Sequence, residues 1–195
     1  MKAKQLIELV ILRLPDIDWD ENLVRLNISL GFNQIFYDTF RKDISNLDLY
    51  AKEYKNVSVD FDATTEKYYS LIPVDSFVQF PDPQEGIRRI SGMKSKDIQF
   101  VPIRGDAAKI FDGDTALSIG NIIGYSVTNG KIEYHWMKEG VVEVKMDIVR
   151  SFEAYDDDDE IHIPSGKDEQ LIQLIVNFLI GAPADNLVND NNLRT

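Results

Sequence analysis

The spacing of hydrophobic positions changes along the chain, from a helical period in the first fifty residues to strict alternation from about residue 56. The first residues predict a short helix that is apolar on most sides and ends at Pro15. A second helix is predicted to start with the capping-box pair Asp18 and Glu21. Its apolar residues form one stripe with further apolar positions beside it: Leu23, Leu26, Leu30, Ile28, Phe32 and Ile35.

The other face of this second helix carries amide side chains instead of charges. The amides are Asn22, Asn27, Asn33 and Gln34. A polar but uncharged face indicates a seam between helices or between subunits. We therefore take Asn27, Asn33 and Gln34 as candidate interface residues.

The middle of the chain predicts a β block. Alternation over 57–61 and the run KYYSLIP (67–73) predict two strands, and EGIRRIS (85–91) and DIQFVPI (97–103) are weaker strand patterns. The segment GDAAKIFDGD (105–114) resembles a short helical turn inside a loop.

The clearest local pattern is a hairpin around Asn129-Gly130, the dipeptide typical of a two-residue turn. This register puts one apolar face on Ile123, Tyr125, Val127, Ile132, Tyr134 and Trp136. The opposite face has Gly124, Ser126, Thr128, Lys131, Glu133 and His135, so His135 is expected to be solvated. A third strand over 142–148, apolar at alternate positions, would complete a β-meander.

The segment IPSGKDEQLIQLIVNFLIG predicts a closing helix within 165–181, with Ser165 and Asp168 as its N-cap arrangement and Gly181 and Pro183 ending it. Apolar residues cover most of its circumference, so we expect it to be buried nearly all round. Only Gln170, Gln173 and Asn177 form a narrow polar stripe.

The remaining residues, 182–195, are too polar to fold alone and are expected to order against a partner. Their apolar side chains, Leu187, Val188 and Leu193, join the three residues of the polar stripe as candidate partner contacts.

Helices, a β block and a closing helix in succession predict an α+β fold in a single domain over 1–195. Its expected parts are helices in 1–50, an antiparallel, meander- or sandwich-like block in 55–155, the helix in 165–181 and the tail in 182–195.

Composition narrows the function classes. The formal net charge is -12, which disfavours a protein that wraps nucleic acid and would instead repel DNA passing nearby. The chain has no cysteine, so disulfides, thiolate zinc sites and cysteine nucleophiles are excluded. The N-terminal apolar run is interrupted by Glu8 and Arg13, which disfavours a signal peptide, and no apolar stretch has the length of a membrane span.

The stretch YDDDDEIHIP (155–164) raises the question of a metal site, and with it a metal-dependent hydrolase. An EF-hand loop needs glycine at its sixth position, but starting at Asp156 or Asp157 places Ile161 or His162 there. His135 and His162 are the only histidines, which is a poor basis for zinc binding or a catalytic triad. We interpret the stretch as a solvated crossing into the closing helix and expect no cofactor.

The hairpin raises one other alternative. Its aromatic side chains, Tyr125, Tyr134 and Trp136, could form a platform for a glycan in a β-sandwich binding module. Such a face is far more often the core of the sheet.

Taken together, the pattern resembles the head-to-tail connector proteins of tailed bacteriophages, the adaptor or tail-tubular rings beneath the portal, including the ring proteins of crAss-like phages. The likeness lies in the helical pair, in a tyrosine-containing strand that ends in proline and an acid, and in a proline followed by an apolar closing helix. The residues are Tyr69, Leu71, Pro73 and Asp75 in the strand, and Pro164 and Leu171 to Ile180 at the end.

The resemblance implies a structural virion protein of the neck or tail, assembled in the bacterial host cytoplasm. It implies a homo-oligomeric ring, commonly of twelve copies, that docks on the portal protein, contacts neighbouring ring proteins and encloses the DNA path. It brings no catalytic residues and no cofactor, and it implies neither sequence-specific nucleic-acid binding nor a membrane.

Overall fold

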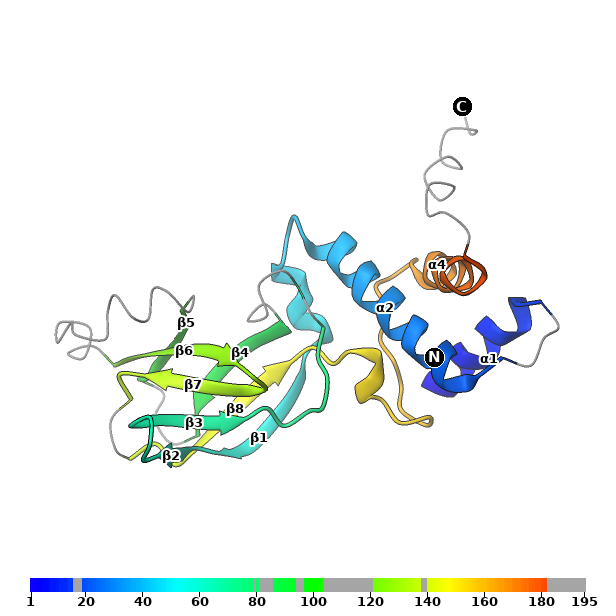
Figure 1. Ribbon diagram of the computed structural model, residues 1–195. Coiled ribbons are helices and arrows are strands. Elements are labelled where there is room, and N and C mark those ends of the chain that lie inside the picture. Colours follow the sequence, from blue (N-terminus) through cyan, green and yellow to red (C-terminus); the bar gives the residue numbers. More distant parts are fainter. Residues whose placement is uncertain are drawn as a thin grey trace. The chain divides into compact units, whose positions relative to one another are not determined.

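The structure is a computed structural model that describes residues 1–15, 19–78, 80, 86–93, 97–103, 121–137 and 140–181. It confirms the mixed α+β fold, with helices at both ends of the chain and two sheets between them (Figure 1). The chain forms two compact units. The helical unit consists of Met1–Asn46, Ser76–Val78 and Arg150–Thr195, and the β unit of Leu47–Asp75 and Gln79–Val149.

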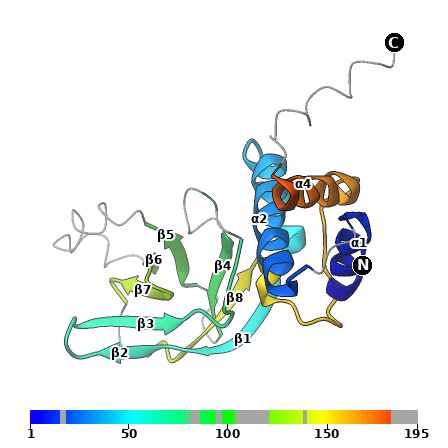
Figure 2. The ribbon, with the colours of Figure 1, turned by 45° about the vertical axis from the view of Figure 1, so that its right-hand side comes forward.

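The helical unit is built from three α-helices and one short 3-10 helix. These are α1 (Ala3–Arg13), α2 (Glu21–Phe40), η4 (Phe152–Ala154) and α4 (Asp168–Ile180). Figures 1 and 2 show α1 and α4 beside the long helix α2. A further 3-10 helix, η1 (Ser45–Tyr50), follows α2 in the chain.

An aromatic cluster forms the core of the helical unit. Phe32 lies at its centre, with its ring centroid 4.7 Å from Phe36, 6.4 Å from Phe152 and 6.3 Å from Tyr155. Gly31 lets α4 approach closely, because a Cβ there would lie 2.9 Å from the Ile175 side chain. The conformational cost of a glycine inside a helix is thus offset by close packing between α2 and α4.

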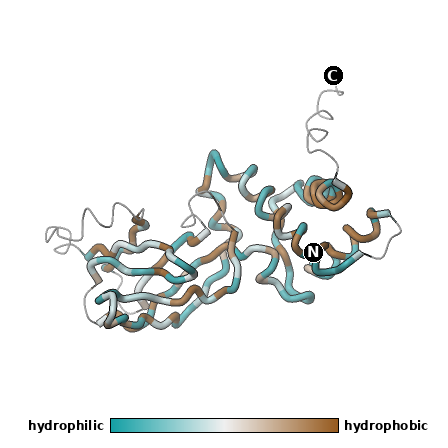
Figure 3. The backbone as a smooth tube through the Cα atoms, viewed as in Figure 1, coloured by the Kyte–Doolittle hydropathy of each residue, from teal (hydrophilic) through white to brown (hydrophobic). Residues whose placement is uncertain are grey.

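Both predicted helix starts are wrong in their capping residues. The N-cap of α2 is Asp20, whose carboxylate accepts a hydrogen bond from Asn22 N at 2.9 Å, whereas Asp18 lies outside the described residues. The N-cap of α4 is Lys167, without a side-chain cap, and Ser165 plays no part. The closing helix is otherwise largely as expected, with one side chain after another buried and only a narrow stripe exposed; Figure 3 colours most of α4 as hydrophobic.

An exposed ion pair links the first helix to the closing helix. The Arg13 guanidinium binds the Glu169 carboxylate through both of its terminal nitrogens, with Nη2 2.9 Å from Oε2. This bidentate geometry lowers the pKa of the Glu169 carboxyl below its ordinary value, because the hydrogen bonds favour the charged form. The pair is solvent-exposed, so it fixes the orientation of the two helices more than it stabilises them.

The β unit holds eight strands in two sheets. A three-stranded sheet has the order β1-β8-β4, formed by β1 (Lys52–Ser58), β8 (Glu143–Ile148) and β4 (Ile87–Gly92). A five-stranded sheet has the order β2-β3-β7-β6-β5. Its strands are β2 (Asp60–Asp62), β3 (Lys67–Leu71), β7 (Lys131–His135), β6 (Ile122–Thr128) and β5 (Gln99–Pro102).

The hairpin prediction is confirmed residue by residue. In β6 and β7, Thr128 pairs with Lys131, Val127 with Ile132 and Tyr125 with Tyr134. Asn129 and Gly130 both have positive φ, as this type of turn requires.

The predicted meander is wrong, because β8 does not pair with β7. It lies in the other sheet, antiparallel to both β1 and β4. Trp136 and Gly140, at φ 60 and φ 116, redirect the chain between β7 and β8. The block is also not wholly antiparallel, since β5 runs parallel to β6.

Two hydroxyl groups connect the two sheets inside the β unit. Tyr134 Oη donates to Ser70 Oγ at 3.0 Å, and Ser70 Oγ donates to the Ser58 carbonyl at 2.7 Å. Burial raises the pKa of the Tyr134 hydroxyl, so the group stays protonated as the donor. The segment at 105–114 lies outside the described residues.

Candidate functional site

The outward side of α2 carries an exposed leucine stripe. Leu23, Leu26 and Leu30 are 44%, 49% and 53% exposed. They lie on one side of the helix because their spacing of three and four residues is close to one turn. The buried side of α2 is elsewhere, on Val24, Ile28, Phe32, Ile35 and Phe36. Of the residues that the sequence groups as one apolar stripe and its neighbours, the three leucines therefore face solvent and the others form the core.

Amides flank these leucines, as the sequence predicts for a seam. Asn27 and Gln34 lie beside the stripe, where Asn27 Nδ2 donates to the Leu23 carbonyl at 2.8 Å and Gln34 Nε2 to Asp38 at 3.0 Å. Asn33 lies on the other flank, half-buried, and its Oδ1 has no hydrogen-bond partner among the described residues.

We call Leu23, Leu26, Leu30 and the three amides the α2 face. The charged side chains of α2 lie off this face. Glu21 and Arg25 pair with each other near the start of the helix, and Asp38 lies beyond its edge. An uncharged face with three leucines is unusual on a chain whose net charge is -12, and exposed apolar patches of this kind mark interaction surfaces.

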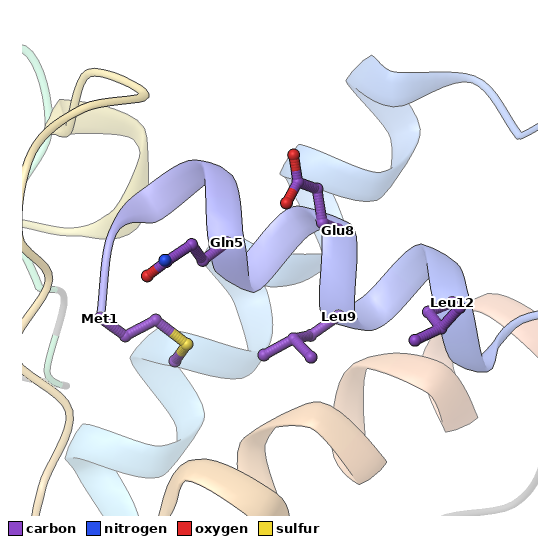
Figure 4. A pocket seen from close by; sticks show the side chains of 5 residues that line it. All are labelled: Met1, Gln5, Glu8, Leu9 and Leu12. Atoms are coloured by element: carbon purple, nitrogen blue, oxygen red, sulfur yellow. The ribbon is translucent and has the colours of Figure 1, made fainter.

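A second exposed apolar surface lies on α1. A hollow of ≈ 600 Å³ is lined, among the described residues, by Met1, Gln5, Glu8, Leu9 and Leu12. Figure 4 shows Met1, Leu9 and Leu12 directed to one side of α1, with Glu8 directed away from them. Leu12 is 81% exposed, so the expectation that this helix is buried on most sides is wrong. Its buried side is Ala3, Leu6, Ile7 and Val10.

The polar stripe predicted for the closing helix is present only in part. Gln170 and Gln173 are exposed, whereas Asn177 is buried and accepts a hydrogen bond from Gln173 Nε2 at 3.2 Å. Gln170 Oε1 accepts from Lys167 Nζ at 2.8 Å. Asn177 is therefore packed inside the helical unit and is not available to a partner. Leu187, Val188 and Leu193 lie outside the described residues.

The acidic stretch holds the N-terminus in place. Its backbone carbonyls accept from the first amides of α1, Asp159 from Ala3 N and Asp157 from Lys4 N, both at 3.0 Å. In return Ile161 N donates to the Met1 carbonyl at 2.9 Å, and Lys2 and Glu160 form a β-bridge. The first amides of a helix have no partner within it, so this loop supplies the missing acceptors.

The carboxylates of the same loop bind cations of the helical unit. Asp158 pairs with Lys2 at 3.0 Å, Asp157 with Arg25 and Asp159 with Arg150 at 2.9 Å. No group of three potential metal ligands occurs in the part of the chain that the structure describes. The loop is exposed at Asp156, Asp157 and Asp158, as expected for a solvated crossing, but it also has a structural role that the sequence did not indicate.

Arg150 is the anchor of this loop. Its guanidinium lies 3.9 Å from the Tyr155 ring centroid, and Nη1 donates to the Ala154 carbonyl and to Asp159 Oδ2. We expect Arg150→Ala to lower the free energy of unfolding by about 2–3 kcal/mol, since it removes charge-assisted hydrogen bonds and a cation–π contact from a mostly buried position.

Urea unfolding followed by circular dichroism measures this loss. Arg25→Ala is the matched control, because it breaks an ion pair with the same loop at a more exposed site and should cost less than about 1 kcal/mol. Equal losses for the two variants would show that Arg150 is not the anchor.

The hairpin does not offer an aromatic platform. Tyr125 and Tyr134 are only 3% and 2% exposed. The predicted solvated position of His135 is also wrong, because His135 is buried and its Nε2 lies 2.9 Å from Ser126 Oγ. Trp136 explains this burial. Its positive φ breaks the strand alternation, and Trp136 and Ile103 cover Gly124, where a Cβ would lie 2.9 Å and 2.0 Å from their side chains.

No protein-family model and no curated protein matches this chain. Among the described residues, no helix combines the length and the hydropathy that crossing a membrane requires. The candidate functional site is thus defined by geometry alone, and it consists of the α2 face and the hollow on α1.

Proposed function

We propose that this chain is a non-enzymatic structural protein that assembles with copies of itself into a ring, and that the ring connects a phage portal to the tail. The observation that carries the proposal is the α2 face, with three half-exposed leucines and no charge among its residues. A face of this composition is suited to contact with another protein rather than with solvent or a small molecule.

Two further features support the proposal. The acidic stretch, the most conspicuous chemical feature of the sequence, is engaged in holding the N-terminus and three cations of the helical unit. The net charge of -12 suits a wall around DNA, because like charge keeps the duplex from adhering to the conduit. The ring protein would thus belong to the virion neck or tail and would need no cofactor.

Electron microscopy tests this function. The purified chain is mixed with the portal protein encoded in the same genome, and negative-stain class averages are compared with those of the portal alone. We expect an additional ring of density at one end of the portal. The proposal is contradicted if the portal averages stay unchanged while the chain remains monomeric.

A further inference from the structure

We infer that the α2 face of one copy packs into the α1 hollow of the next copy, so that neighbours in the assembly meet through two different surfaces. The inference rests on the proposed function for the closing of these contacts into a ring. It adds the two surfaces that meet, and their order around the ring.

Charge identifies a second copy as the occupant. Copies of a chain with a net charge of -12 repel each other, so they approach most easily where neither surface adds charge. The α2 face contains only leucines and amides, and the hollow has one carboxylate, on Glu8. A basic partner would instead be attracted to the exposed carboxylates of Asp156, Asp157 and Asp158.

The location of the two surfaces favours unlike contacts. Each lies on the side of its helix opposite the buried residues, which are Leu6 and Val10 in α1 and Ile28 and Ile35 in α2. Because α1 and α2 bury these residues in one helical unit, their outer sides face away from it in different directions. A ring requires contacts of this head-to-tail kind, since a contact between identical patches ends at a dimer.

The chemistry of the two surfaces also matches. The apolar lining of Met1, Leu9 and Leu12 can receive the leucines of the α2 face. Glu8 and Gln5 at the hollow can accept hydrogen bonds from amide N–H groups of Asn27 and Gln34, each of which has two such donors. Carboxylate and amide acceptors would then be satisfied as water leaves the contact.

The size of the contact predicts its strength. The α2 face has six residues and the hollow is lined by five, whereas a stable pairwise interface has about 20–30 residues on each side. A single contact between two copies is therefore weak. Each copy in a closed ring makes two such contacts, which is how a weak pair contact can hold an assembly together.

The absence of cysteine makes the chain suitable for a cross-linking test. Leu26→Cys places one thiol on the α2 face, and Leu12→Cys places one in the hollow. One of the two chains carries a tag that makes it separable by mass, and a short bismaleimide is added to each variant alone and to their mixture. Glu153→Cys, at an exposed site away from both surfaces, reports random collisions.

We expect the mixture to give at least about tenfold more cross-linked dimer than either variant alone, in an amount that rises with protein concentration. Equal cross-linking of Leu26→Cys with itself would overturn the inference in favour of a symmetric dimer. Cross-linking no higher than that of Glu153→Cys would overturn it altogether. Either result leaves the portal experiment intact, and a chain that cross-links as expected but ignores the portal would sink the proposed function alone.

Discussion

Leu26→Glu is expected to abolish assembly while leaving the fold intact. The side chain is about half exposed in the single chain, so the substitution should change the free energy of unfolding by less than about 0.5 kcal/mol. In the assembly the same position is buried against a neighbour, and an unpaired carboxylate there costs several kcal/mol. We therefore expect self-association to weaken at least about a hundredfold, as measured by the concentration dependence of sedimentation.

Leu49→Glu provides the matched control for this result. Leu49 is 80% exposed in η1, away from the α2 face, and the substitution makes the same chemical change. It should leave both assembly and stability at the wild-type level. If the two variants assemble equally well, the α2 face is not an interface.

The second large effect concerns the opposite side of the same helix. Phe32→Ala is expected to lower the free energy of unfolding by about 3–5 kcal/mol, because it opens a cavity at the centre of the aromatic cluster. Urea unfolding followed by the helical signal in circular dichroism measures the loss.

Leu30→Ala, two residues earlier, is the comparison for Phe32→Ala. Leu30 is exposed and alanine favours helix, so its effect on stability should stay near zero. A large loss for Leu30→Ala together with a small one for Phe32→Ala would reverse the assignment of the two sides of α2.

Local patterns in the sequence predict local structure well in this chain. The Asn129-Gly130 hairpin has the predicted register, because turn chemistry and alternation both act over a few residues. Pro15 follows α1 by two residues, and the apolar residues of α4 are mostly buried. The α+β class follows from the same local patterns, taken in order.

Partner choice at long range could not be predicted in the same way. Alternation shows that Val144, Met146 and Ile148 share a buried face, but it does not show that β8 pairs with β1 and β4. His135 was misplaced for a similar reason. One residue with positive φ, Trp136, takes its ring off the expected face, and no residue type announces that conformation at a tryptophan.

The candidate site was predicted in half of its chemistry. The amides Asn27, Asn33 and Gln34 pointed to a seam along α2, where the structure places them beside exposed leucines. The sequence could not separate Leu23, Leu26 and Leu30 from the core, because both sides of α2 are apolar. Only the positions of α1, α4 and η4 decide which side they cover.

The mass of the portal particle tests the central claim most directly. Mass photometry of the portal with and without an excess of this chain gives the mass that is added to each particle. A homo-oligomeric ring predicts a single added mass equal to a whole number of 22.3 kDa chains, and Leu26→Glu should reduce it sharply. A portal particle of unchanged mass, beside a persistent 22.3 kDa monomer, would contradict the account.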